Sequence, residues 1–232
     1  MHFARRLVIA VLVAACPMAV SHAAGKQVAG RVDGNKFVDQ LYGFSFEKYD
    51  NWTFGKVQQE DPAKPARVRF TLMQQNYEIP ADRQSTQESF TPPGLGLWVD
   101  TTSLSAESLA AEISNIKSKA KWRKDLAQAA SFIDRGTLMD RGPIQINGSD
   151  GIRQQYRINY EAQVYNRVTD KTSVITDALI GDLYVVTNHG RVYAFFFRAE
   201  RVAYPTLKDQ VKGMILTMDF TPPADSATGN AH

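Results

Sequence analysis

The chain has 232 residues, of which 44% are hydrophobic and 22% are charged. This is the composition of a globular protein, and it excludes a disordered, collagen-like or multi-pass membrane chain. The 27 basic and 24 acidic residues give a net charge of only +3, so the charge gives no indication of nucleic-acid binding.

Residues 1–23 have the features of a secretory signal peptide. Arg5 and Arg6 form a positive n-region, the stretch Leu7–Ala15 is apolar, and Ser21-His22-Ala23 offers small residues to a signal peptidase. The apolar stretch is shorter than the about 20 residues of a transmembrane helix. We expect cleavage after Ala23 and export to the periplasm. Removal of the signal leaves 25 basic and 24 acidic residues, which again indicates no nucleic-acid partner.

A second cleavage site remains open. Val13-Ala14-Ala15-Cys16 resembles the lipobox of bacterial lipoproteins, whose cysteine is acylated and becomes the mature N-terminus. The residues that follow, Pro17–Val20, are apolar, whereas lipoproteins usually carry a polar tether there. Secretion without a lipid is the main expectation, and an outer-membrane lipoprotein anchored through Cys16 is the alternative.

Short strands are predicted in the first half of the mature chain. Residues 24–36 are small and polar and indicate a linker. Apolar side chains alternate with small or polar ones in Tyr42–Phe46 and Val68–Leu72, as in half-buried strands. Strands are also expected over Trp52–Val57 and Leu95–Asp100, and the polar stretch between them indicates an exposed loop over Asn76–Pro93.

A helix is predicted next, beginning at Ser105, which is a suitable N-cap, and continuing through Trp122 to about Ala130. Its apolar residues recur at helical spacing: Leu109, Ile113, Ile116 and Ala120. The remaining elements alternate in hydrophobicity or end at turn residues. In chain order they are a strand near Phe132, the turn Asn147–Gly151, the strand Ile152–Tyr160, a polar connection over Gln163–Thr172, the strands Ala178–Thr187 and Val192–Ala199, a helix after Pro205, a strand over Met218–Phe220 and a tail over residues 221–232.

A basic segment in this helix is the one candidate interaction patch. It holds five cations beside an aromatic residue: Lys117, Lys119, Lys121, Trp122, Arg123 and Lys124. Such a cluster suits anionic lipid headgroups or an acidic partner, and thus a peripheral contact with a membrane. The alternative interpretation is a solvated helix face with Trp122 turned into the core.

The scarcity of reactive side chains excludes several chemistries. Cys16 is the only cysteine, and of the four histidines only His189 falls inside the expected domain, in a turn between two apolar strands. A disulfide, a thiol nucleophile and a histidine-rich metal site are therefore not expected. No Gly-x-Ser-x-Gly or complete glycine-rich phosphate loop occurs either. We expect no catalytic, metal-binding or cofactor-binding residue.

Several segments resemble the PsbP/Mog1-like domains. The residues that carry the resemblance are Phe37-Val38-Asp39, Tyr42-Gly43-Phe44-Ser45-Phe46, Asn51-Trp52, the helix near Ser105, the Asn147-Gly148 turn and the closing Met218-Asp219-Phe220. The usual proline before the tryptophan is absent, since Tyr49-Asp50 stands there. The resemblance implies a single α+β domain over residues 37–220, an α/β/α sandwich with a central, mainly antiparallel sheet. Known members of the family act mostly as non-catalytic binding or accessory proteins.

These observations predict an exported cell-envelope protein that binds an unknown protein or a small ligand and performs no catalysis. Two alternatives stay open. One is the membrane-anchored structural lipoprotein described above. The other is a carboxylate-dependent envelope hydrolase, because 24 acidic residues are scattered along the chain and a sequence does not show which of them converge.

Overall fold

The computed structural model describes residues 30–55, 66–77, 92–166 and 169–221. The expected signal peptide with Cys16, the tail and most of the loop expected before Gly94 lie outside these ranges. The described elements are, in chain order, β1 (Gly30–Asp33), β2 (Lys36–Asp39), β3 (Phe44–Glu47), β4 (Trp52–Phe54), β5 (Val68–Gln74), β6 (Gly94–Thr101), α1 (Ala106–Ser114), α2 (Lys121–Ala129), α3 (Phe132–Arg135), β7 (Thr137–Ile146), β8 (Ser149–Asn166), β9 (Lys171–Asn188), β10 (Arg191–Glu200), α4 (Tyr204–Leu216) and β11 (Asp219–Phe220).

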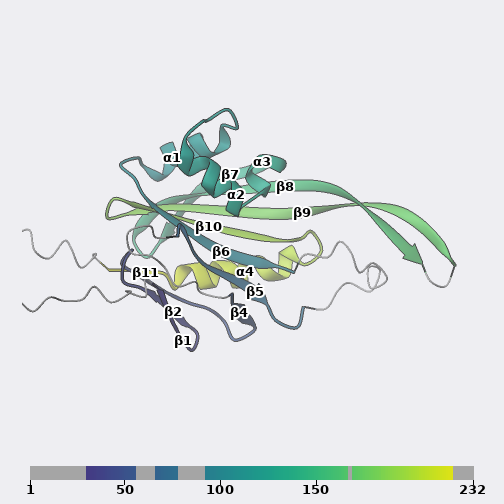
Figure 1. Ribbon diagram of the computed structural model, residues 1–232, viewed down its shortest axis with the longest axis horizontal. Coiled ribbons are helices and arrows are strands. Elements are labelled where there is room, and N and C mark those ends of the chain that lie inside the picture. The colour runs from purple at the N-terminus through teal and green to yellow at the C-terminus, as the bar shows by residue number, and fades with distance from the viewer. Residues whose placement is uncertain (1–29, 56–65, 78–91, 167–168, 222–232) are drawn as a thin grey trace, which may run out of the picture.

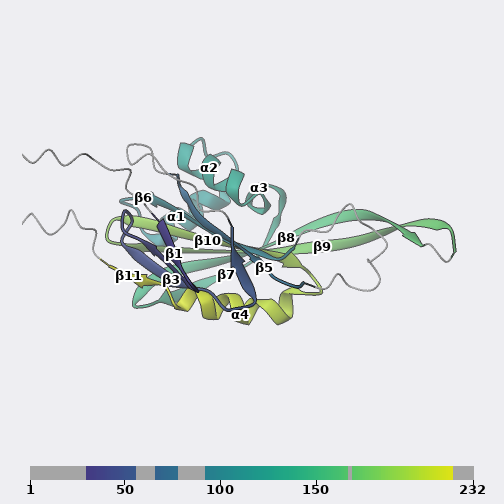
Figure 2. The ribbon, with the colours of Figure 1, turned by 60° about the horizontal axis from the view of Figure 1, so that its bottom comes forward.

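The strands form two antiparallel sheets. The larger has the order β4-β5-β6-β10-β9-β8-β7, and the smaller has the order β1-β2-β3-β11. Helices α1, α2 and α3 cover one face of the larger sheet, whereas α4 and the smaller sheet lie on the opposite face (Figures 1 and 2). The fold is thus an α+β sandwich around an antiparallel sheet, which confirms the fold class expected from the sequence.

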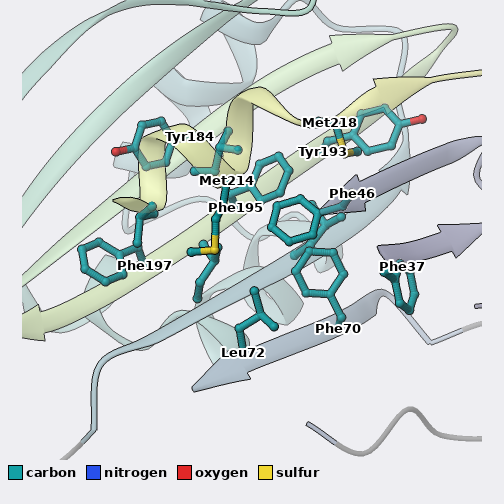
Figure 3. Packing of buried hydrophobic residues seen from close by; sticks show 14 of the residues in the cluster. Phe37, Phe46, Phe70, Leu72, Tyr184, Tyr193, Phe195, Phe197, Met214 and Met218 are labelled. Atoms are coloured by element: carbon teal, nitrogen blue, oxygen red, sulfur yellow. The ribbon is translucent and has the colours of Figure 1, made fainter. Parts of the chain in front are cut away.

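Strand alternation gives the larger sheet two apolar faces. Along β10, Tyr193, Phe195 and Phe197 point to the α4 side, and Ala194 and Phe196 point to the α1–α3 side. Both faces are covered, which accounts for a strand that is apolar at nearly every position. On the α4 side, Phe46 and Phe70 lie 4.7 Å apart between ring centroids and pack beside Phe195 (Figure 3). This side joins the two sheets and α4 in one core.

The helix expected over residues 105–130 is two helices. Ser105 caps α1 as predicted, accepting a hydrogen bond from Ser108 N, but α1 ends at Ser114 and α2 begins only at Lys121. Between them, the side chain of Asn115 accepts from Lys117 N at 3.1 Å, and Ser118 Oγ accepts from Ala120 N at 3.4 Å. These local bonds compete with the helical ones and account for the break.

Two hairpin turns lie where the sequence predicted them. Asn147 and Gly148, between β7 and β8, have φ values of 45° and 79°. His189 and Gly190, between β9 and β10, have φ values of 46° and 71°. Two consecutive residues with positive φ match the twist of the flanking strands, so each pair closes its hairpin with a two-residue loop.

Three other expectations are wrong. Part of the linker expected over residues 24–36 is β1, which pairs with β2 from Gly30↔Asp39 to Asp33↔Lys36. The strand expected to begin at Phe132 follows the short helix α3 instead. The polar connection expected over 163–172 is strand at both of its ends, because β8 continues to Asn166 and β9 begins at Lys171. The polar composition of this segment indicated a loop. It is compatible with strand pairing because, beyond the body of the domain, neither strand packs an apolar face against a core.

Beyond the body of the domain, β8 and β9 pair only with each other. Their register runs from Asn159↔Ala178 to Asn166↔Lys171, and this ribbon projects far from the other elements (Figures 1 and 2). Among the described residues, no helix is long and apolar enough to cross a membrane.

Candidate ligand-binding site

A pocket opens on the α1–α3 side of the larger sheet, where α2 ends and α3 begins. Its volume is about 300 Å³, which is at the small end of the range for ligand pockets. We call it the Arg198 pocket. It is lined by Thr71, Leu72, Met73, Pro92, Gly94, Leu95, Ala129, Ala130, Ser131, Phe132, Phe196 and Arg198.

Two glycines flank Arg198 in the sheet. Arg198 of β10 is in register with Gly94 of β6 and with Gly181 of β9. The space above Gly181 is filled, because a Cβ there would lie 2.6 Å from Cγ of Phe132. The space above Gly94 is open, since a Cβ would meet only two backbone oxygens, at 3.4 and 3.9 Å. Gly94 is therefore the floor of the pocket beside the arginine.

Aromatic rings form the walls. The ring of Phe196 lies over Gly96, where a Cβ would be 2.2 Å from Cζ of Phe196. On the other side, Phe132 is buried and packs against Tyr156 with their ring centroids 5.6 Å apart. Because Gly96 and Gly181 have no side chains, the rings of Phe196 and Phe132 lie close to the sheet, and a hollow remains between them.

Arg198 carries the only charge in this lining. In the part of the chain that the structure describes, its guanidinium makes no ion pair and no hydrogen bond. Arg198 is exposed at the mouth of the pocket, and partial burial lowers its pKa from the ordinary value, because a low-dielectric surrounding disfavours the charged form. An arginine nevertheless stays protonated in proteins, so the pocket presents an uncompensated positive charge beside apolar walls.

A second hollow adjoins the first, since both are lined by Ala129. This Trp98 groove has a volume of about 740 Å³ and is lined by Ala66, Arg67, Val68, Trp98, Lys121, Asp125, Gln128 and Ala129. Its arginine, Arg67, is paired with Asp125 and with Asp100, the latter at 3.2 Å. Trp98 is 1% exposed, and its indole N–H has no acceptor among the described residues. The groove differs from the Arg198 pocket in this pairing, and its other cation, Lys121, is an exposed lysine.

A fully buried carboxylate lies on the face of the larger sheet opposite the Arg198 pocket. Asp182 of β9 is 0% exposed and accepts from Tyr204 at 2.6 Å and from Arg153 at 3.0 Å. Burial and then the hydrogen bond to Asp182 raise the pKa of Tyr204 to about 12. Burial also disfavours the charge on Arg153, but the attraction of Asp182 and the contacts with Tyr204 and Tyr184 together outweigh this and raise the pKa of Arg153.

The Asp182 cluster is a structural anchor. Tyr204 is the first residue of α4, so its bond to Asp182 ties that helix to the sheet. None of the three side chains lines either hollow. No three histidine, cysteine or acidic side chains within the described ranges are grouped so that they would hold a metal ion.

The structure separates the residues of the predicted basic patch. Lys117, Lys119, Lys121 and Lys124 are exposed. Arg123 is 3% exposed and does not join them. Its guanidinium donates to the carbonyl of Ile113 at 3.0 Å and to Asp134 at 2.8 Å, and so ties α1, α2 and α3 together.

Trp122 is half-buried, and its ring centroid lies 6.4 Å from that of Trp98. The tryptophan thus packs toward the sheet, as the alternative interpretation of this segment expected. His189 is exposed in its turn. The remaining predicted site residue, Cys16, lies outside the described residues.

Sequence reasoning missed the Arg198 pocket. Its strands come from three separate parts of the chain, and the sequence predicts only the end of a loop at Pro93 and a strand beginning at Leu95. One feature of the sequence nevertheless indicated a hollow at this place. Gly94 and Gly96 are two residues apart on a strand and therefore share a face, which marks a place where other groups approach the backbone closely.

Comparisons with known proteins give low similarities. No protein-family model matches the chain, and neither does any curated protein. The solution structure of cyanobacterial PsbP (CyanoP) from Synechocystis sp. PCC 6803 is similar with a TM-score of 0.41 and 12% identity over 88% of this chain and 99% of that one. LpqN, involved in cell envelope biogenesis of Mycobacterium tuberculosis, is similar with a TM-score of 0.39 and 12% identity over 77% and 83% of the two chains. A protein from Bacteroides thetaiotaomicron has a TM-score of 0.38 and 10% identity over 82% of this chain and 50% of that one.

The similarities to CyanoP and to LpqN are both at low sequence identity. These values carry no argument about function.

Proposed function

We propose that this chain is an exported binding or accessory protein of the cell envelope, without catalytic activity, and that it receives its ligand in the Arg198 pocket. One observation carries the proposal: the pocket combines apolar walls with a single ionisable side chain, and that side chain is an arginine. A guanidinium that stays protonated serves neither as a general acid nor as a general base.

The hydroxyl groups in the pocket fit the same interpretation. Thr71 and Ser131 line it, but a hydroxyl becomes a nucleophile only beside a base such as histidine or a carboxylate. No such base is among the residues that line the pocket in the described part of the chain. The site is therefore suited to holding a molecule rather than to breaking a bond in it.

Binding is tested with N-phenyl-1-naphthylamine, an uncharged apolar dye that fluoresces when it leaves water. The mature chain is expected to bind it saturably. Gly94→Val fills the floor of the pocket and is expected to weaken binding at least tenfold. Gly142→Val is the matched control, because a Cβ at this strand glycine meets nothing within 4 Å. Equal binding by all three proteins would contradict a ligand function for the pocket.

The export part of the proposal rests on the leader sequence and has its own test. Mass spectrometry of the protein from its native membrane and soluble fractions gives the mature N-terminus. A chain that begins at Ala24 without modification supports the secreted form. A diacylated chain that begins at Cys16 supports the lipoprotein alternative instead, and an intact leader would refute export.

A further inference from the structure

We propose that the Arg198 pocket selects a small amphipathic anion, with one carboxylate or phosphate head at Arg198 and an apolar body against Phe196 and Met73. This inference rests on the proposed binding function and specifies the chemical class of its ligand.

The first argument is charge complementarity. Arg198 has no ion-pair partner within the described ranges, whereas Arg67 in the adjacent groove is paired with two aspartates. Its neighbours across the sheet, Gly94 and Gly181, carry no side chain that would neutralise or cover it. A guanidinium offers a planar fork of N–H donors that matches the two oxygens of a carboxylate or phosphate. The site is thus complementary in charge to a ligand with an anionic head group.

The second argument is the chemistry of the walls. Phe196, which is half-buried, lines the pocket, and Met73 adds an exposed thioether side chain at the β5 side; Phe132 closes the far wall but is 2% exposed. Burial of apolar ligand surface against such walls contributes about 25 cal/mol per Å². A free inorganic anion gains nothing from them, so an apolar body is needed for recognition at this site.

The third argument concerns size and the number of charges. A volume of about 300 Å³ accommodates a head and a short apolar body rather than a polymer. A single arginine pairs with one anionic head, and a second charged group elsewhere on the ligand would lie in the apolar part of the pocket without a partner. Hydroxyls of Thr71 and Ser131 line the same pocket and offer donors to any remaining head oxygen.

The test measures calorimetric binding of four eight-carbon probes to the mature chain: octanoate, octyl phosphate, octanol and octylammonium. Acetate and inorganic phosphate serve as heads without a body. We expect octanoate or octyl phosphate to bind at least tenfold more tightly than octanol and octylammonium. The ranking of the two anions distinguishes a carboxylate from a phosphate head, and either ranking supports the proposal.

Three variants locate the recognition. Arg198→Gln is expected to weaken anion binding at least tenfold and to leave octanol binding unchanged, and Arg198→Lys to restore part of the loss. Gly94→Val is expected to weaken all probes. Arg157→Gln, at an exposed arginine on β8, is the control and is expected to change nothing. Because Arg198 has no partner to lose within the described ranges, its variants are expected to fold, which thermal unfolding verifies.

The outcomes separate this inference from the proposed function. If octanol binds as tightly as the anions and Gly94→Val abolishes both, the pocket binds ligands but the anionic class is refuted. The same holds if Arg198→Gln leaves anion binding intact, or if acetate and inorganic phosphate bind as tightly as the long probes. If Gly94→Val binds every probe like the unaltered chain, the binding function of the pocket is refuted as well.

Discussion

The close approach of α3 to the sheet depends on the absence of a side chain at Gly181. In Gly181→Ala, the new methyl would lie 2.6 Å from Cγ of Phe132 and within 2.9 Å of both Cδ atoms. These atoms are at the root of a ring that is 2% exposed, so the ring has no free end to swing aside. Overpacking of this kind costs about 1–3 kcal/mol, and the reduced freedom of the unfolded chain returns about 0.4–1 kcal/mol.

The difference between these two ranges is a fall in the free energy of unfolding of about 0–2.6 kcal/mol, and we expect the middle value of about 1.3 kcal/mol for Gly181→Ala. For a domain of this size, that corresponds to a fall in Tm of about 3–5 °C. Gly94→Ala is the matched control in the same row of the sheet, because its methyl would make only ordinary contacts. It is expected to raise the Tm by about 1–4 °C.

Urea and thermal unfolding, followed by circular dichroism, measure both variants. The double variant Gly181→Ala/Phe132→Leu supplies the decisive comparison, because a narrower side chain relieves the crowding. The two substitutions should couple favourably by about 0.5 kcal/mol or more. Equal effects of alanine at both glycines, or strict additivity in the double variant, would refute this account of how α3 packs.

Two further predictions follow from buried side chains. Arg123→Met is expected to destabilise the fold by about 1–3 kcal/mol in urea unfolding, since it removes two hydrogen bonds. The control Lys124→Met, at an exposed neighbour, should change the free energy of unfolding by no more than about 0.5 kcal/mol. Equal losses in the two variants would contradict the structural role of Arg123. Burial raises the pKa of Tyr193 to about 12, above the value of about 10 in an unfolded chain. Between these pH values the folded chain keeps a proton that the unfolded chain loses, so the free energy of unfolding should fall as pH rises. In unfolding measured from pH 9 to 12, Tyr193→Phe should flatten this decline, and the exposed control Tyr49→Phe should not.

Strands that alternate between two covered faces were predictable from the sequence. Ile152, Tyr156 and the residues around the Asn147-Gly148 and His189-Gly190 turns follow rules that act over a few residues. The helix boundary at Ser114 was not predictable from periodicity. Ile116 continues the apolar spacing of α1, yet it lies beyond the end of the helix and is 70% exposed. Local side-chain hydrogen bonds outweighed the pattern there.

The pocket was harder to predict because it depends on contacts between distant segments. A sequence shows that Gly94 and Gly181 lack side chains, but not that a ring from α3 covers one of them and leaves the other open. The same limit applies to the basic segment. Arg123 and Lys124 are adjacent cations, and only the packing of α2 shows that the first is buried.

The ribbon formed by the outer parts of β8 and β9 has a consequence for local unfolding. At the base of the ribbon, Tyr160 donates a hydrogen bond to Glu200 at 2.5 Å and Arg201 forms an ion pair with Asp177 at 3.1 Å. These two interactions join the ribbon to the end of β10. Farther out, each strand has the other as its one neighbour in the sheet, and a lone pair of strands is marginally stable. Amide protons near Lys171 should therefore exchange with solvent through fraying of the tip, whereas those of the central strands exchange only when the whole domain opens.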